Sequence, residues 1–372
     1  IVDFDVLDGL EEFWEASRLL DLKGCVGIES RVFVPEFSDR EINSPGEPGI
    51  SYHMGTGFTT TAIPAEAQAF LDNMRSTSAQ RNQAMVTRVN EFLSPLVLNY
   101  DEDVLPLTPN GNATERHLCL AYARKAASMF PEESDLRKFW SEKLGVSQDD
   151  IKDLPEGRPI TDLIRAKTMK QGGVGYVKPD SGSFPKMAEM NEFVLLCGAI
   201  PTFTWLDGCS VGEQSIEELV EVGRSTGVAA FNIIPDRNYT PGQSDQKLEN
   251  LNQVIQLTKD LGLPLLGGTE MNSPGQKFVD DFASPELAPH QAVFLRGSWI
   301  LHAHSTLQRY AGMGYLSEWA NNQFPDISAK NEFYASFGES FSPRGDDRLK
   351  DSLNAEMGAT EVSDLMTKVM SV

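Results

Sequence analysis

Helices and strands alternate along residues 187–270, and the connections between them are short. Each segment with helical spacing of its apolar residues is followed by a short apolar run that is typical of a buried strand. The pairs are MAEMNEFVLLCG with AIPTFTW, GEQSIEELVEVGRSTG with VAAFNIIP, and SDQKLENLNQVIQLTKDLG with LPLLGGTE. Strands that are joined through helices in this way lie parallel to one another. The pattern therefore predicts an α/β fold.

The rest of the chain divides by its secondary-structure pattern. Strand-like runs, KGCVGIESRVFVPEF and ISYHMGTGF, lie in residues 1–62. Residues 63–189 read as helices, including one long helix or two in AEAQAFLDNMRSTSAQRNQAMVTRVNEFL and a helix in NATERHLCLAYARKAASMF, where Asn112 and Glu115 have capping-box spacing. We predict a barrel body of residues 1–62 and 190–280, a helical insertion of residues 63–189, and a helical C-terminal region of residues 281–372.

The charge of the chain excludes some partners. The formal net charge is -22, from 32 basic and 54 acidic residues. Nucleic-acid backbones and anionic membranes repel such a chain, so neither is expected as a partner. An anionic substrate would need local cations or metal ions to offset the global field. We expect a soluble protein with the cytoplasm favoured, while the sequence leaves the compartment and the oligomeric state open.

Cysteine usage gives no metal or redox motif. Cys25, Cys119, Cys197 and Cys209 are scattered, and no CxxC pair occurs. The expected state is a buried free thiol, since a chain of this size does not need disulfides.

Polar residues at the strand ends are the first candidates for chemistry, because active sites of parallel barrels lie at the carboxyl ends of the strands. The residues at those positions are Asp3 to Asp5, Glu29, His53, Trp205, Pro235 to Arg237, and Thr269 to Asn272.

These strand ends resemble motifs of the PHP (polymerase and histidinol phosphatase) family of metal-dependent phosphoesterases. The family has a Thr-Asp-His-Asp strand, a GLxEFxEAA helix and a GIE strand, and the chain has VDFDVLDGLEEFWEAS and CVGIESRVFV. Later motifs correspond to ISYHMGTGF, GNATERHLCLA, GAIPTFTWL and GGTEMNSPG. The resemblance implies a distorted PHP-like (β/α) barrel with the helical insertion covering its site.

Several metal-binding positions of that family are replaced. Phe4 and Trp205 stand where the family has histidines, and Glu270 and Asn272 stand where it has Asp and His. The family's opening His-x-His strand would lie before Ile1. We expect such residues in the native protein, because a barrel without that strand would expose an unpaired edge.

The resemblance implies a divalent metal, of manganese, zinc or iron type. The ligands that remain are Glu29, His53 and Glu270, with Asn272 and Asp3 as further candidates. Each has a structural alternative: an ion pair for Glu29, a core position for His53, a cap for Glu270, a turn for Asn272, and Asx-type loop bonds for Asp3 and Asp5.

Substrate contacts are predicted from the basic residues near these motifs. Glu270, Arg116 and His117 are the catalytic candidates, with Arg116 holding a phosphate at a helix start. Arg237, Lys170 and Lys178 are the substrate-binding candidates. His302 and His304 in LHAHS would share a face on a strand, where they could bind metal, but would point apart on a helix.

Three functions remain open at this point. The leading one is a metal-dependent hydrolase of small phosphate esters, in which metal-activated water attacks phosphorus. The second is a degenerate relative that binds a small molecule or a protein without hydrolysing phosphate esters, which Phe4 and Trp205 favour. The third is a metal-dependent enzyme with altered chemistry.

Overall fold

The computed structural model describes residues 1–177, 182–238, 245–271 and 276–371. The chain forms two compact units. The first consists of Ile1–Phe70, Pro185–Met271 and the segment from Gln276 onward, and the second consists of Leu71–Phe184. The second unit falls within the expected insertion 63–189, whereas residues 281–372, expected as a separate region, belong to the first unit.

The described part of the first unit contains a six-stranded sheet in the order β1-β2-β3-β4-β5-β6. All neighbouring pairs are parallel except those of β3, which is antiparallel to both β2 and β4. The sheet curls into a half-barrel, and the described strands do not close it into a full barrel. The strands are β1 Val2–Phe4, β2 Val26–Phe33, β3 Ile50–Phe58, β4 Ile200–Trp205, β5 Ala230–Ile233 and β6 Leu265–Gly267.

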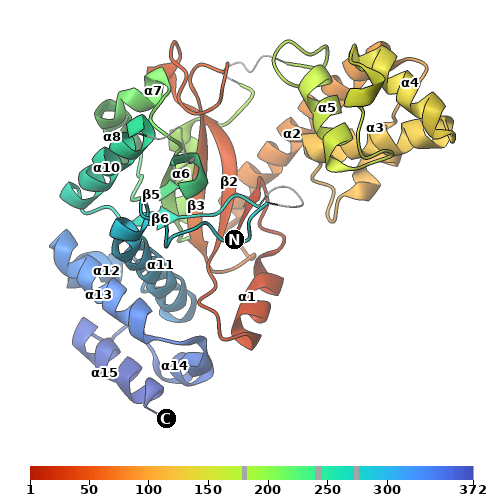
Figure 1. Ribbon diagram of the computed structural model, residues 1–372. Helices are drawn as coiled ribbons and strands as arrows, with labels where there is room; N and C mark the ends of the chain where they lie inside the picture. Colours follow the sequence, from red (N-terminus) through yellow and green to blue (C-terminus); the bar gives the residue numbers. More distant parts are fainter. Residues whose placement is uncertain (178–181, 239–244, 272–275, 372) are drawn as a thin grey trace. The chain divides into compact units, whose positions relative to one another are not determined.

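Helices accompany this sheet in the first unit, and the last ones along the chain lie away from its strands (Figure 1). They are α1 Leu10–Leu19, the start of α2 Ala65–Leu93, α6 Met187–Leu196, α7 Val211–Gln214, α8 Ile216–Ser225, α9 Pro235–Asn238, α10 Asp245–Asp260, α11 Gln291–Ala311, α12 Glu318–Gln323, α13 Ile327–Ser340, α14 Asp346–Ser352 and α15 Ala359–Met370. Among the described helices, none combines the length and the apolar character that a membrane span requires.

The register divides the sheet into two faces, because residues paired across strands point the same way and successive residues alternate. One face, which we call the Glu29 face, carries Phe4, Glu29, Met54 and Thr202, each paired with the next across β1 to β4. The other, the His53 face, carries Ser30, His53, Phe203 and Phe231, paired in the same way across β2 to β5.

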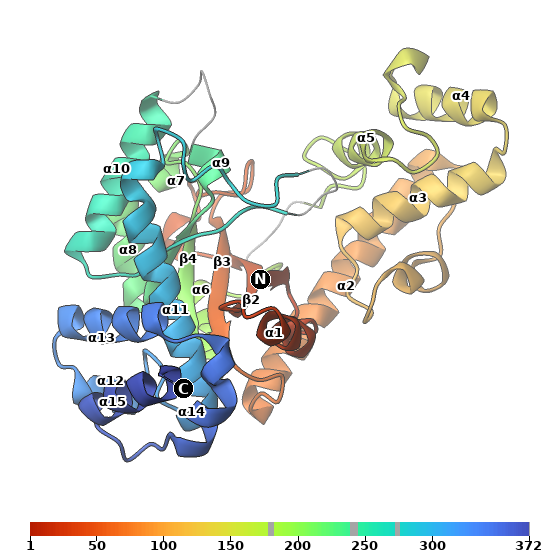
Figure 2. The ribbon, with the colours of Figure 1, turned by 60° about the horizontal axis from the view of Figure 1, so that its bottom comes forward.

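Helix α6 covers the His53 face, where Val194 packs against Gly55 so closely that a side chain at Gly55 would clash. Helix α11 packs on the opposite face, and its residues Ile300 and Ala303 share a buried cluster with Ile200 and Ala230. Figure 2 shows α11 running along the sheet. The Glu29 face is thus covered by α11 near the start of β4 and β5, which leaves the carboxyl ends of the strands for a site.

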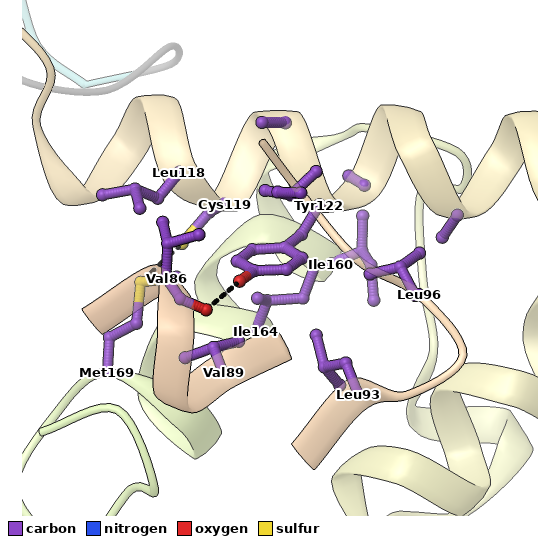
Figure 3. Packing of buried hydrophobic residues seen from close by; sticks show 14 of the residues in the cluster. Val86, Val89, Leu93, Leu96, Leu118, Cys119, Tyr122, Ile160, Ile164 and Met169 are labelled. Carbon is purple, nitrogen blue, oxygen red and sulfur yellow. Dashed lines mark hydrogen bonds between the residues drawn. The ribbon is translucent and has the colours of Figure 1, made fainter. Parts of the chain in front are cut away.

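The second unit has its own core. It contains most of α2, α3 Glu115–Met129, α4 Glu133–Leu144 and α5 Arg158–Thr168, and apolar side chains of α2, α3 and α5 interlock around Tyr122 (Figure 3). The Tyr122 hydroxyl is fully buried and donates to the carbonyl of Val86 at 3.1 Å. The AEAQAF…NEFL segment is one continuous helix, of which residues 65–70 belong to the first unit.

Short helical turns complete the connections. They are Pro35–Phe37, Tyr100–Val104, Leu105–Leu107, Gln148–Asp150, Ala288–His290 and Pro343–Gly345.

Candidate active site

Glu29 is the central residue of the candidate site. It lies on β2 beside Phe4 and Met54, and its side chain is half-buried. Burial raises the pKa of the Glu29 carboxyl to about 7, and the neighbouring carboxylates of Glu270 and Asp5 add to the shift by repulsion. A carboxyl with a pKa near neutrality can both hold and release a proton, as a general acid or base must.

Asp5 follows β1 directly and is buried. Its backbone has φ of 61°, which is uncommon for a residue with a side chain, and its N–H donates to the carbonyl of Glu29 at 2.9 Å. The Ser30 hydroxyl donates to Oδ1 of Asp5 at 2.6 Å. Asp3, by contrast, lies within β1 and is exposed, and its carboxylate accepts the N–H of Phe4 at 2.8 Å.

Glu270 follows β6 and pairs with Arg237, which lies in the short helix after β5. Nη2 and Nε of Arg237 lie 2.8 Å and 3.1 Å from Oε2 of Glu270. The arginine side chain is 50% exposed and the glutamate side chain 27%. Arg237 is therefore positioned both to orient Glu270 and to meet an anion arriving from solvent.

The loop after β4 is held by buried polar groups. The Glu213 carboxylate is buried and accepts the backbone N–H groups of Leu206, Asp207 and Gly208 at 2.8 to 3.1 Å. Burial raises the pKa of Glu213 to about 7, although these three hydrogen bonds act in the opposite direction. Asn250 donates to the carbonyl of Asp207 at 2.9 Å. These contacts fix the carboxyl end of β4, as a precise site requires.

Arg31 is a charged residue of the Glu29 face that the sequence analysis did not single out. It lies two positions after Glu29 on β2 and so shares the Glu29 face, where its Nη1 is 2.9 Å from Oε2 of Glu47. Ser44 donates to the same oxygen at 2.6 Å. The two-residue period of a strand would have indicated Arg31 once Glu29 was placed on it.

The structure does not bring His53 together with Glu29, with which it was expected to share a metal ion. It pairs with Ser30 and Phe203 on the other face of the sheet. Nε2 lies 2.6 Å from Oδ1 of Asn191 on α6, and burial lowers the pKa of His53 to about 4. His53 is therefore a buried histidine of the core, which was the alternative to a metal-binding role.

Phe4 and Trp205, the two apolar residues at positions where the PHP family has histidines, lie on different faces of the sheet. Phe4 pairs with Glu29 and therefore places an aromatic ring on the Glu29 face. Trp205 is buried, and alternation along β4 places it with Phe203 on the His53 face. Only Phe4 therefore brings apolar bulk to the candidate site.

His302 and His304 lie in helix α11, so the two rings point apart. His304 is buried between two partners: Nε2 lies 3.1 Å from the carbonyl of Gly57, and Nδ1 accepts the N–H of Tyr315 at 2.9 Å. His302 stacks on Phe341. Neither forms the strand pair that would bind a metal.

Arg116, His117 and Lys170 belong to the second unit, and each has a partner there. Arg116 pairs with Asp162, and Lys170 lies 2.9 Å from Glu115. The His117 ring accepts the N–H of Thr114 at 3.1 Å, so α3 is capped by Thr114 and His117 rather than by Asn112 and Glu115. Their proposed catalytic and binding roles stay predictions.

Two further candidates, Lys178 and Asn272, lie outside the described residues.

The described residues hold no group of three or more His, Cys, Asp or Glu side chains arranged to bind a metal ion by themselves. The carboxylates of Asp5 and Glu270 do lie near that of Glu29. Their repulsion contributes to the raised pKa of Glu29. The donor atoms are all oxygen, which suits magnesium or manganese better than zinc.

Comparisons with known proteins give remote structural similarities. No protein-family model matches the chain, and no curated protein does. The chain is similar to an amidohydrolase from Chromobacterium violaceum, whose structure has bound sulfate and no metal. The identity is 15%, the match covers 79% of this chain and 85% of that one, and the TM-score is 0.47. It is also similar to a candidate metal-dependent phosphoesterase from Bifidobacterium adolescentis, at 16% identity, 78% and 84% coverage and a TM-score of 0.46. The resemblance to the PHP family stays a prediction.

Proposed function

We propose that the protein is a hydrolase of small phosphate esters and that its active site lies on the Glu29 face, at the carboxyl ends of the strands. The observation that carries this proposal is the environment of Glu29. Burial and the carboxylates of Glu270 and Asp5 raise its pKa to about 7. Glu29 lies in the middle of β2, level with Phe4 at the end of β1, and groups with strongly perturbed pKa values are characteristic of catalytic sites.

In this proposal Glu29 is the general acid or base and Arg237 is the phosphate contact. Glu29 is half protonated near pH 7, so it can accept a proton from water and return it to the leaving oxygen. Arg237 has a half-exposed guanidinium, and Glu270 holds it in place through one carboxylate oxygen. Its remaining N–H groups match the geometry of a phosphate.

A divalent cation fits the same carboxylates. Glu270 and Asp5 would hold it while Glu29 remains the general acid or base, and a hard cation such as magnesium would complete its coordination with water and substrate phosphate, since the described residues hold no group of three metal-binding side chains. When bound, such an ion supplies a Lewis acid for the phosphate and lowers the pKa of water. The carboxylates offer oxygen donors only, which favours magnesium or manganese over the zinc and iron options.

The test is hydrolysis of p-nitrophenyl phosphate with magnesium, with manganese and with EDTA. We expect metal-stimulated turnover that falls at least 100-fold in Glu29→Gln. Arg237→Gln should raise KM about tenfold with a smaller change in kcat, since its contact holds the phosphate in both ground and transition states. The matched control is Glu192→Gln, because Glu192 is an exposed carboxylate on α6. Equal activity in Glu29→Gln and the control would refute the proposal.

A second function is favoured by Phe4, whose ring stands on the Glu29 face beside the carboxyl group. An apolar side chain there favours a protein that binds a small anion without hydrolysing it. Binding of phenyl phosphate, followed by phosphorus NMR, with no product after prolonged incubation with either metal would support this function over the first.

A further inference from the structure

A cavity lies at the amino-terminal ends of β5 and β6, just before their first residues. It has a volume of about 370 Å³, within the range of small-molecule sites. Its apolar walls come from Val228 and Ala229 ahead of β5, Leu261 and Leu263 ahead of β6, and Leu316 and Ile327 from the C-terminal helices. Figures 1 and 2 show α13 near the end of α10 that precedes β6, where Gly262 faces Ile327.

Lys330 supplies the charge of this cavity. It lies in the first turns of α13 and is only 8% exposed, with Nζ 4.5 Å from the centre of the Tyr315 ring. No carboxylate of the described residues lies within ion-pair distance of Nζ. Burial lowers the pKa of Lys330, which reflects the cost of keeping its ammonium out of water. Arg224 adds a second, exposed cation at the rim.

The walls of the cavity are fixed by contacts of their own. The Tyr315 hydroxyl donates to Oδ1 of Asn331 at 2.5 Å, and Nδ2 of Asn331 donates to the carbonyl of Gly262 at 2.8 Å. Gly262 has φ of 67°, and a side chain added there would press on Ile327 at about 3.0 Å. The loop before β6 is therefore held against α13, and the cavity exists before any ligand arrives.

We propose that this cavity binds a small monocarboxylic acid with an apolar body. The carboxylate would pair with Lys330, and the apolar body would cover the leucine, valine and isoleucine side chains of the walls. A single buried ammonium among apolar walls matches one negative charge attached to hydrocarbon better than it matches a phosphate, which requires several donors. Since the chain as a whole carries a net charge of -22, a local cation is needed to attract any anion.

The experiment is calorimetric titration with sodium octanoate, with neutral octanol as the comparison ligand. We expect one octanoate per chain and at least tenfold weaker binding of octanol. Lys330→Met keeps a similar volume and removes the charge, so octanoate affinity should fall at least tenfold. Ala229→Leu keeps Lys330 but fills the cavity, and it should weaken octanoate and octanol alike. Lys350→Met is the control, because Lys350 is an exposed lysine on α14.

The results separate the proposal from its rivals. Circular dichroism shows whether each variant is folded. If Lys330→Met does not fold, Ala229→Leu still tests the site. Absence of octanoate binding, affinity unchanged in folded Lys330→Met or in Ala229→Leu, or equal affinity for octanol would each overturn the proposal. It does not depend on hydrolase activity, so failure of the phosphatase assay leaves it standing.

Discussion

Replacing Glu29 by glutamine should change how the stability of the protein depends on pH. Burial, together with Glu270 and Asp5, raises the pKa of Glu29 from 4.5 to about 7. The folded state therefore binds the proton more tightly than the unfolded state. The contribution of this proton to folding is complete below pH 4.5 and is lost as the pH rises through about 7.

The size of this loss follows from the shift. A change of roughly 2.5 pKa units at about 1.36 kcal/mol per unit gives a ceiling of about 3.4 kcal/mol. Because the Glu29 side chain is only half-buried, solvent screens part of the repulsion, and we expect about 2 kcal/mol between pH 5 and pH 8. Glutamine keeps the shape and has no charge to bury, so the variant should lack this component.

The assay is urea unfolding of the wild type and Glu29→Gln at pH 5 and pH 8, followed by tryptophan fluorescence. At pH 8 the variant should be more stable than the wild type by about 2 kcal/mol, while at pH 5 the two should nearly agree. Glu192→Gln should follow the wild type at both values. If the free energy of unfolding of Glu29→Gln falls between pH 5 and pH 8 as much as that of the wild type, the raised pKa is refuted.

Two further substitutions test contacts away from the site. Tyr122→Phe removes the hydroxyl that bonds the carbonyl of Val86 and Oδ1 of Asn90, and it should cost about 1–2 kcal/mol in urea unfolding; a change below 0.3 kcal/mol, on the order of a surface substitution, would contradict the contact. His304→Leu leaves the buried carbonyl of Gly57 and a backbone N–H without partners, and it should cost about 2–3 kcal/mol at pH 7.5; unchanged thermal unfolding would show that water replaces the ring.

Elements with a strong local pattern could be predicted from the sequence. The three helix–strand pairs of residues 187–270 correspond to α6 with β4, α8 with β5 and α10 with β6, and those strands are parallel. The apolar residues of each helix recur with helical spacing because one face of the helix is buried against a strand. This pattern lies within a few neighbouring residues, so it can be read from the sequence. Glu29 could also be singled out, since a carboxylate within an apolar strand needs a reason to be there.

Pairing between distant segments could not be predicted in the same way. The sequence ISYHMGTGF indicates a strand, but nothing in it states that β3 runs antiparallel between β2 and β4. The N-terminal cap of α3 could not be predicted correctly either, although it involves only neighbouring residues. Asn112 and Glu115 have the usual spacing, yet the helix begins at Glu115, because the His117 ring can accept the N–H of Thr114 in place of a carboxylate.

The position of His53 can be tested by moving the imidazole one residue along β3. Met54 pairs directly with Glu29, so its side chain lies on the face that His53 avoids. Met54→His should therefore add a nitrogen donor next to Glu29 and strengthen zinc binding at least tenfold, measured by competition with a fluorescent chelator at pH 7.5. Met54→Gln is the control, since it changes polarity without adding a strong zinc ligand. If both variants bind zinc as the wild type does, the assignment of Glu29 and Met54 to one face is wrong, and the oxygen-only site proposed on that face falls with it.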